Sequence, residues 1–392
     1  MEKERIYRVG LDVIYMASCA LRNQVPERFR LSEMDFARLY KMAKRHSMEA
    51  IVYLSLNSAN EKYADLNIDP DLLSRWKRDY HETIKRLVQL DLERENLYAF
   101  LESEGSWYVG LKGIVLSHYY PTLGMRQMTD NDILIDPAFA KKIRGYFENR
   151  GYTVYSYGNH CHDVYVKGSL TFEIHRMLAE DVDKTKAAYK YYKDVKRILI
   201  PDEGAMSMSF SKEDFYVYYV FHAYKHFSHS GCGLRTLMDM FVYTSKEEGL
   251  NYNYICGQLK ILGIDGYEKR WRKLAELLFC SDVEEVYSPN LLTGEESETL
   301  LCYISSGTFG TTERMIENTL LDLADGAEIT AATRLKYILK RLFPKYEFYK
   351  TSYPVASKFI VTIPILWLLR VFRSLLKGRK ISKELKQINT KK

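Results

Sequence analysis

The sequence predicts an α+β fold in which a small mixed sheet is flanked by an N-terminal and a C-terminal helical region. Two observations carry this prediction. Apolar residues recur at helical spacing from residue 6 to about 105 and again from about 202 to 343, whereas short strand-like runs alternate with helical ones in between. The chain has 392 residues, 46% hydrophobic and 28% charged, which is enough for two or three packed units.

Three helical segments are expected before residue 105. The first two are IYRVGLDVIYMASCAL and DFARLYKMAKRHSMEAIVYLSL. The third opens at Asp69-Pro70, which places a capping residue before a proline at the first helical position, and it closes near Gly105.

The pattern changes at residue 106. SWYVGLKG is typical of a short strand, IVLSHYY of a helix that Pro121 ends, and NDILI of a buried strand. Asp136-Pro137 then predicts the start of a helix that runs to Gly151.

Two further strand-like segments complete the predicted sheet. They are YTVYSYG and HDVYVKGSLTFEIH, and Gly168-Ser169 divides the second segment as a hairpin turn would. Beyond a linker at Pro201-Asp202 the helical period returns. We therefore expect four parts: an N-terminal helical region (1–105), a core that carries the sheet (106–200), a C-terminal helical region (201–345) and an amphipathic basic tail (346–392).

Cysteine use and the N-terminus favour a cytoplasmic location. The first ten residues, MEKERIYRVG, carry charge where a secretory signal needs an apolar core. The cysteines show neither a CxxC pair nor zinc-site spacing, which favours a reducing compartment. They are Cys19, Cys161, Cys232, Cys256, Cys280 and Cys302.

The end of the chain is basic. Residues 370–392 hold nine Lys or Arg and one acid, a net charge of +8, while residues 1–369 sum to −2. The 11 uncharged residues from Phe359 to Leu369 are too few for the roughly 20 that cross a bilayer. This composition fits peripheral contact with anionic lipid at the inner membrane face, and it fits RNA binding or docking onto the protein body as well.

Asp130 and Asp132, in TDNDILI, are the main functional candidates. On a strand they share one face, at roughly 7 Å between Cα atoms, whereas Asn131 and Ile133 take the other. Two like charges in a half-buried place raise each other's pKa, and a hard divalent cation removes that penalty. Mg²⁺ suits such a site because it takes oxygen ligands and is completed by substrate phosphates; Mn²⁺ is the alternative ion.

A third acid is expected from a neighbouring strand. In SLTFEIHRML the apolar residues Leu170, Phe172 and Ile174 form one face, so Glu173 and His175 project from the other. We expect this strand to lie beside NDILI, which would bring Glu173 to the two aspartates.

A turn is the alternative interpretation of the aspartate pair. TDND is good turn chemistry, because Asp and Asn side chains bond their own backbone, and a lone DxD pair is a weak signal. The pair alone leaves both interpretations open.

Longer stretches carry a resemblance to a known family. VGLKGIVLSHYYPTLGMRQMTDNDILI, followed by GYTVYSYGNHCHDVYVKGSLTFEIHRML, resembles the nucleotidyltransferase-fold proteins of the polymerase beta superfamily. It is most similar to a bacterial group with the pattern LKG, then R-x-M-x-D-x-D, then a strand that ends E-I-H. FHAYKHFSHSGCGLRTLMDM resembles that group's helical signature. The resemblance covers about residues 30–345 and is strongest over 109–240.

The resemblance implies a mixed sheet on which three carboxylates bind Mg²⁺, and transfer of a nucleoside monophosphate from an NTP to an acceptor. Asp130 and Asp132 match the metal pair, and Glu173 matches the third acid. The acceptor could be a sugar, an antibiotic-like small molecule, a peptide, a protein or RNA. Such transfer relies on in-line positioning and charge neutralisation, which metals on three carboxylates supply. Glu173 could also act as the base that takes the acceptor's proton.

Nucleotide binding is expected ahead of the aspartate pair. Lys112-Gly113 stands where the superfamily has a Gly-Ser or Gly-Gly turn, and the second small residue of that turn is Ile114 here. Arg126, four residues before the pair, is a candidate fork for phosphate. The alternative is that Arg126 is an arginine of a surface loop.

A later helix offers further candidates. His222 and His226 lie four residues apart beside Lys225, but the glutamate of an HExxH zinc motif is missing. We expect this helix to form a wall of the nucleotide cleft, with Lys225, His226 and Arg235 facing phosphates. The alternative is that Arg235 and Asp239 form a structural pair and that the histidines are satisfied core residues.

His162 and His175 are candidates for the acceptor site. His175 is the stronger, because it shares the face of Glu173. His160 and His162 alternate on a strand edge, where histidines without a matching cysteine or acid are more often structural.

Two other functions remain open from the sequence. A glycosyltransferase could bind a nucleotide-sugar diphosphate through Mn²⁺ on the DxD pair, but it would need a larger region of parallel strands before that pair. A degenerate fold that binds nucleotide or a partner without turnover is the other, and the incomplete match at Lys112-Gly113 favours it.

Overall fold

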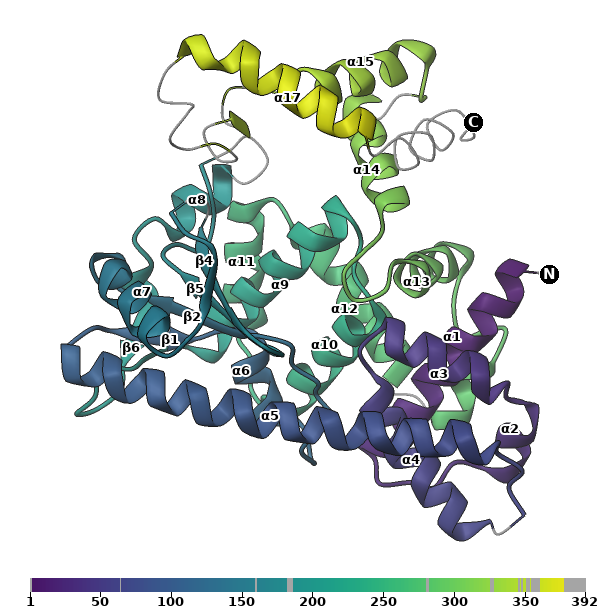
Figure 1. Cartoon of the computed structure of the whole chain (residues 1–392). Coiled ribbons are helices and arrows are strands. Elements are labelled where there is room, and N and C mark those ends of the chain that lie inside the picture. The colour runs from purple at the N-terminus through teal and green to yellow at the C-terminus, as the bar shows by residue number, and fades with distance from the viewer. Residues whose placement is uncertain are drawn as a thin grey trace.

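The computed structural model describes residues 2–63, 65–158, 161–181, 186–279, 282–324, 328–344, 346, 348–349, 353 and 360–376. It confirms the α+β class, because helices flank a five-stranded mixed sheet and a separate two-stranded sheet (Figure 1). The predictions about His160 and about the basic residues after 376 lie outside the described residues.

The N-terminal region is helical, as predicted. Its last helix, α5, begins and ends where the sequence indicates: the Asp69 carboxylate accepts from the backbone amides of Asp71 and Leu72, and Gly105 closes the helix with φ +68°. With 35 residues, α5 is about 52 Å long. The helices are α1 (Glu2–Leu21), α2 (Arg28–Glu33), α3 (Phe36–Arg45), α4 (Glu49–Lys62) and α5 (Pro70–Glu104).

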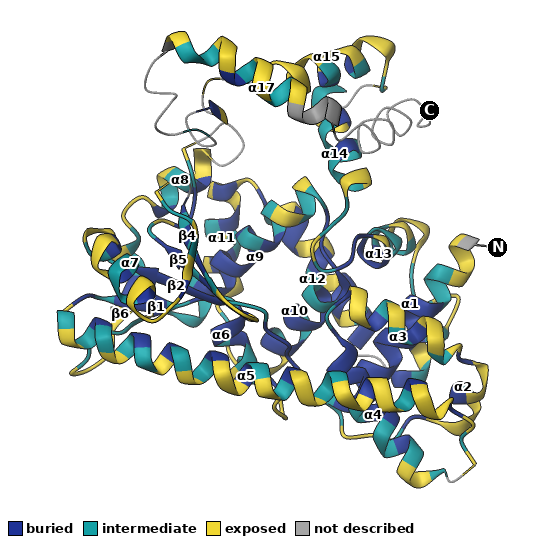
Figure 2. Cartoon of the chain, viewed as in Figure 1, coloured by how far each residue is buried: buried dark blue, intermediate teal, exposed yellow. Residues whose placement is uncertain are grey.

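Two hydrophobic cores share α5. Its buried residues are spaced by three, four or seven positions and so form one stripe along the helix. Leu72 and Trp76 join a large core with α1, α4 and the C-terminal helices, whereas Leu87 and Leu97 join a smaller core with the sheet. Figure 1 shows α5 running along both parts, and Figure 2 shows exposed residues on its outer side.

The five-stranded sheet has the order β1-β2-β5-β4-β3. β2 and β5 are parallel, and the other neighbours are antiparallel. Gly168, at φ +60°, and Ser169 connect β4 to β5 as predicted. The strands are β1 (Tyr108–Gly110), β2 (Asn131–Ile135), β3 (Thr153–Ser156), β4 (His162–Lys167) and β5 (Leu170–His175).

Short helices connect these strands. α6 (Gly113–Leu116) continues into a 3-10 turn before Pro121. The helix predicted after Asp136 begins as a 3-10 turn and becomes α7 (Ala140–Asn149). Both connections follow the sequence prediction, with tighter first or last turns than expected.

The linker predicted at Pro201-Asp202 is instead part of a small hairpin. β6 (Leu199–Pro201) pairs with β7 (Met208–Phe210), and Gly204, at φ +72°, lies in the turn between them. Strands of three residues are too short to show alternation, so the proline and glycine dominate the sequence pattern. α8 (Lys186–Tyr192) and a 3-10 helix (Val195–Ile198) precede this hairpin.

The C-terminal region is helical, and it packs against the N-terminal one. α1 contacts α12 and α13, so the large core joins the beginning of the chain to its second half. The division into four parts stays a prediction. The helices are α9 (Lys212–His229), α10 (Leu234–Lys246), α11 (Tyr252–Leu262), α12 (Asp265–Phe279), a 3-10 helix (Val283–Tyr287), α13 (Gly294–Ser306), α14 (Thr312–Ala324), α15 (Ala331–Leu342), a 3-10 turn (Ile360–Thr362) and α17 (Ile363–Leu376).

The apolar segment near the C-terminus forms α17. Its Trp367 donates from Nε1 to the carbonyl of Leu342 at 2.9 Å and stacks on Phe343, while Ile365 and Leu368 remain exposed. Among the described helices, none combines the length and the apolar character that crossing a bilayer requires. Contact of this segment with a membrane surface stays a prediction.

Candidate active site

The three predicted acids meet on two neighbouring parallel strands. Asp132 of β2 lies opposite Glu173 of β5 in the strand register, and Asp130 immediately precedes β2. One carboxylate oxygen from each lies within 4.8 Å of the others. The expected pairing of the two strands is confirmed, and it brings the three side chains together as one acid cluster (Asp130, Asp132 and Glu173).

Asn131, between the two aspartates, points to the opposite face of the sheet. Its Nδ2 donates to the carbonyl of Leu90 in α5 at 2.9 Å, and its Oδ1 accepts from Arg94 at 3.4 Å. Because side chains alternate along a strand, fixing Asn131 against α5 turns both flanking aspartates towards the acid cluster.

Lys112 supplies the nearest positive charge. Its Nζ donates to Asp132 Oδ1 at 2.6 Å and lies 3.8 Å from Glu173 Oε2. Lys112 has φ +48° and ψ −114°, a backbone conformation that costs a non-glycine residue about 1–3 kcal/mol and that persists only where the surrounding fold enforces it. Gly113 follows and opens α6, where a Cβ atom would lie 3.2 Å from Met128. The Lys112-Gly113 turn therefore delivers an ammonium group to the acid cluster.

Two histidines complete the immediate surroundings. His175 Nε2 lies 2.9 Å from Asp132 Oδ1 and 3.7 Å from Glu173 Oε2. His162 Nε2 is also 3.7 Å from Glu173 Oε2, and the two imidazole rings have their centroids 4.9 Å apart. Both acceptor-site candidates thus lie beside the acids.

The pKa values of the three acids are shifted in different directions. Burial alone would raise the pKa of Asp132, but the Lys112 ammonium and the His175 ring outweigh it and hold this pKa well below its usual range. Burial and the neighbouring Asp132 carboxylate raise the pKa of Glu173 to about 8. The same two causes raise the pKa of Asp130. At neutral pH the metal-free cluster therefore keeps a proton on Glu173.

The acid cluster fits a hard divalent cation. Its three donor groups are carboxylates, the ligands that Mg²⁺ prefers, and their oxygens already lie within 4.8 Å of one another. A bound cation would offset the repulsion that raises two of the three pKa values.

Arg126 lies in a different setting from the one predicted. It is buried, and its Nε donates to Asp239 Oδ1 at 2.7 Å, while the hydroxyl of Tyr120 donates to the same oxygen at 2.7 Å. The surface-loop alternative is wrong, because Arg126 is only 8% exposed. The alternative pairing of Asp239 with Arg235 is not what the structure shows, since Asp239 bonds Arg126. Binding of phosphate by Arg126 stays a prediction.

The predicted helical wall is α9. Burial and the charge of Lys112 lower the pKa of His175, and the charge of Lys225 lowers it further by a smaller amount. His226 is exposed, with its Nε2 3.1 Å from that of His222. Arg235, at the start of α10, donates to the carbonyl of Gln127 at 3.0 Å. Nucleotide contacts by Lys225, His226 and Arg235 stay predictions.

Tyr218 is a neighbour of the acid cluster that the sequence analysis missed. It is buried on α9, and its phenol and the Lys112 ammonium influence each other's pKa. Tyr218, His222 and His226 are spaced by four residues, so they lie along one face of the helix. That spacing was visible in the sequence and could have identified Tyr218.

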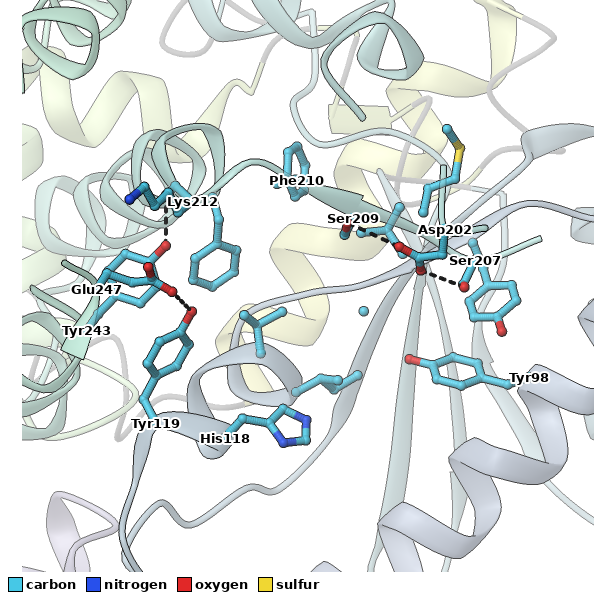
Figure 3. A pocket seen from close by; sticks show the side chains of 17 residues that line it. Tyr98, His118, Tyr119, Asp202, Ser207, Ser209, Phe210, Lys212, Tyr243 and Glu247 are labelled. Atoms are coloured by element: carbon cyan, nitrogen blue, oxygen red, sulfur yellow. Dashed lines mark hydrogen bonds between the residues drawn. The ribbon is translucent and has the colours of Figure 1, made fainter. Parts of the chain in front are cut away.

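An aromatic cavity of about 380 Å³ lies against β1 and α6 (Figure 3). Figure 3 shows Tyr119 bonded to Glu247 on one side and Asp202 bonded by Ser207 and Ser209 on the other. Among the described residues, its lining includes neither the three acids nor Lys112. The cavity and the acid cluster are therefore separate features.

The sheet and its clustered carboxylates define a nucleotidyltransferase-fold protein. The model of a family described as uncharacterised nucleotidyltransferase matches residues 32–279. The chain belongs to this family, whose description indicates a transferase. Comparison with curated proteins and with solved structures yields no match.

Proposed function

We propose that the protein is a Mg²⁺-dependent nucleotidyltransferase that moves a nucleoside monophosphate from an NTP to an acceptor. The observation that carries this proposal is the convergence of Asp130, Asp132 and Glu173, within 4.8 Å, in a chain of a nucleotidyltransferase family. The three acids would hold a metal, which would supply positive charge to neutralise the charge that develops on the phosphates of the donor.

Residues of the chain would bind the metal and the phosphates of the donor. Asp130, Asp132 and Glu173 would hold the metal, and the Lys112 ammonium would meet the triphosphate at the edge of the acid cluster. Lys225 of α9 and Arg235 of α10 are proposed to add further positive charge around the triphosphate. Neutralising and orienting the phosphates is the main requirement of phosphoryl chemistry, so these contacts account for most of the expected rate enhancement.

The acceptor is proposed to approach over Glu173 and the two histidines. Glu173 Oε2 lies 3.7 Å from both His162 and His175, so a hydroxyl placed there would meet a carboxylate and imidazole groups. We propose that Glu173 takes the acceptor's proton. The isosteric Glu173→Gln variant should lose turnover by about 100-fold or more, and undiminished turnover would exclude this role.

A glycosyltransferase is less consistent with this fold. It requires a larger region of parallel strands before the DxD pair. In the described part of the chain before β2, the strand is the three-residue β1, and it pairs antiparallel.

The first experiment measures the melting temperature of the purified protein with each of ATP, CTP, GTP and UTP, with and without Mg²⁺. It compares wild type, the variant Asp130→Asn/Asp132→Asn, and Asp71→Asn, an exposed aspartate of α5, as a control. A ligand at 100 times its Kd stabilises by about 2.7 kcal/mol. We expect a Mg²⁺-dependent rise with one or more NTPs that the double variant loses and the control keeps.

The other outcomes discriminate between functions. Stabilisation by a UDP-sugar with Mn²⁺, and by no NTP, would support the glycosyltransferase. Stabilisation by an NTP without transfer to any acceptor in a screen of sugars, amines, peptides and RNA would support a binding protein of the same fold. A rise that the double variant retains would place the nucleotide away from the acid cluster and contradict the proposal.

A further inference from the structure

His162 and His175 face each other across two antiparallel strands. They are direct partners in the register of β4 and β5, and Glu173 precedes His175 by two residues on the same face. The three side chains offer two imidazole nitrogens and a carboxylate oxygen that lie within 4.8 Å of one another. This group shares Glu173 with the acid cluster but has different donor chemistry.

His46 shows what a structural histidine looks like in this protein. It is fully buried, its Nε2 lies 3.1 Å from the carbonyl of Ile304, and its Nδ1 accepts from the amide of Leu234 at 3.0 Å. Both ring nitrogens are therefore satisfied. His162 differs in both nitrogens: Nε2 faces Glu173 Oε2 at 3.7 Å, and the remaining Nδ1 is buried without a hydrogen-bond partner among the described residues. Packing alone does not explain the placement of His162.

The distances suit a metal ion with nitrogen ligands. Tetrahedral coordination at about 2.1 Å places donor atoms about 3.4 Å apart. Both imidazole nitrogens lie 3.7 Å from Glu173 Oε2, so these two separations differ from that value by a few tenths of an ångström. His162 and His175 project from paired strands, so their backbone positions are fixed before any ion binds.

We propose that His162, His175 and Glu173 form a second metal site, which binds a divalent first-row transition-metal ion of the Zn²⁺ or Co²⁺ type. Two histidines and one carboxylate, with a position left open, are a known ligand set for such ions. Mg²⁺ strongly prefers oxygen ligands, so the two sites differ in the ion that they select. The inference rests on the proposed function in that both sites use Glu173, and an ion held by His162, His175 and Glu173 would take the position proposed above for the acceptor and its base.

The protonation of the two rings agrees with this assignment. Burial, together with the charges of His175 and Lys112, lowers the pKa of His162 to about 3. Burial also lowers the pKa of His175. Both shifts favour the neutral imidazole, which is the form that binds metals.

Occupation of the site exchanges one hydrogen bond for a metal bond. His175 Nε2 now lies 2.9 Å from Asp132 Oδ1, and as a ligand it would carry its proton on Nδ1 instead. Asp132 keeps its bond to Lys112. When all three carboxylates are ionised, the acid cluster and Lys112 together carry a net charge of −2. One divalent ion balances this charge. We therefore expect this ion to bind without nucleotide, whereas Mg²⁺ arrives with the NTP.

The test is a titration of the metal-stripped, untagged protein with Co²⁺, followed by visible ligand-field absorption and by calorimetry, without nucleotide. Wild type should bind one Co²⁺ per chain in the spectroscopically visible site. His162→Gln should weaken this binding by at least about 100-fold, since removing even an outer partner of a metal ligand weakens binding 10–100-fold. His175→Gln should do the same.

Three variants serve as controls. Exposed His81→Gln controls for adventitious binding, His226→Gln for the pair at i and i+4 on α9, and Asp130→Asn for the acid cluster. The two histidine controls should keep the Co²⁺ affinity within about threefold. Asp130→Asn removes a neighbouring negative charge but no ligand of this site, so it should weaken Co²⁺ binding by less than either ligand variant. Melting curves of the metal-free variants confirm folding, and if His175→Gln fails to fold, His162→Gln decides.

Several results would overturn the inference. They are the absence of Co²⁺ binding by wild type, binding that His162→Gln retains, and binding that is lost in Asp130→Asn or His226→Gln. Because nucleotide is absent, failure of the second site leaves the Mg²⁺-dependent stabilisation by NTP intact. Conversely, Co²⁺ binding without any NTP effect would support this site while contradicting the proposed function.

Discussion

Two buried aspartates, each paired with a cation, lie in contrasting surroundings. Asp239 bonds Arg126 and accepts from the hydroxyl groups of Tyr120 and Tyr219, at 2.7 and 3.3 Å. Asp132 bonds Lys112, but two further acids, Asp130 and Glu173, lie beside this pair. The first pair has balanced charge and satisfied hydrogen bonds, whereas the second has more acid than its cation can neutralise.

The difference separates a balanced ion pair from a candidate binding site. Disruption of a balanced pair leaves an uncompensated charge inside the protein. A surplus of carboxylates is costly in the free protein and is relieved when a cation binds. The same substitution, Asp to Asn, should therefore mainly reduce folding stability at Asp239 and mainly reduce ligand binding at Asp132.

The largest effect is expected at Asp239. Asp239→Asn leaves Arg126 charged and buried, so it should lower the free energy of unfolding by about 3–5 kcal/mol. Urea denaturation measures this loss. The control is Lys44→Met, which removes a half-exposed partner of Asp79 and should cost less than about 1 kcal/mol. Equal losses of stability in the two variants would show that the buried Arg126–Asp239 pair contributes no more than an exposed ion pair.

Asp132→Asn should instead remove ligand binding. We expect it to abolish the stabilisation of about 2.7 kcal/mol that an NTP at 100 times its Kd provides in the presence of Mg²⁺. Without ligand the loss of stability should be much smaller than at Asp239. Removal of the Asp132 charge lowers the pKa of Glu173, so Glu173 can ionise beside Lys112 and replace the lost partner. Melting curves with and without NTP measure both quantities, and an unchanged NTP effect would refute the assignment.

His46 adds to the comparison a buried, uncharged side chain whose two ring nitrogens are both hydrogen-bonded. Burial lowers its folded pKa to about 3, below the ordinary value of 6.5, so protonation favours the unfolded chain. This contribution to stability is complete above pH 6.5 and is lost as the pH falls. Between pH 6.5 and 5, the stability advantage of wild type over His46→Gln should shrink by about 2 kcal/mol. A constant difference between the two would show that His46 does not titrate in this way.

The smallest effect is expected at Asp130. Burial and the charge of Asp132 raise its pKa, so the ionised form is unfavourable in the metal-free protein. Asp130→Asn should leave the free energy of unfolding in the presence of a chelator unchanged or raise it by up to about 1 kcal/mol. A decrease of more than 1 kcal/mol would show that Asp130 is a structural residue.

Local patterns in the sequence predicted much of this arrangement. Alternation in TDNDILI predicted that the two aspartates share a face, and alternation in SLTFEIH predicted the face of Glu173 and His175. Asp69-Pro70 and Gly105 gave both ends of α5. Each of these features depends on neighbours in the chain, which is why the sequence reveals it.

Long-range partners could not be predicted in the same way. Arg126 meets Asp239 across 113 residues, so its burial was invisible in its own segment. The contact of Lys112 with Asp132 depends on the backbone conformation at Lys112, which side-chain patterns do not report. The β6–β7 hairpin was missed because Pro201 and Gly204 are also typical of linkers.

The length of α5 has a consequence for fragments of this protein. Its second half covers the sheet with Leu87, Leu97 and neighbouring leucines, while the carbonyl of Leu90 accepts from Asn131 and fixes the strand that bears the acids. Its first half belongs to the other core. A fragment that begins at residue 106 would keep every acid of the site and lose the surface that orients them. Expression of the sheet region alone should therefore yield a protein with one bare apolar face that is prone to aggregation.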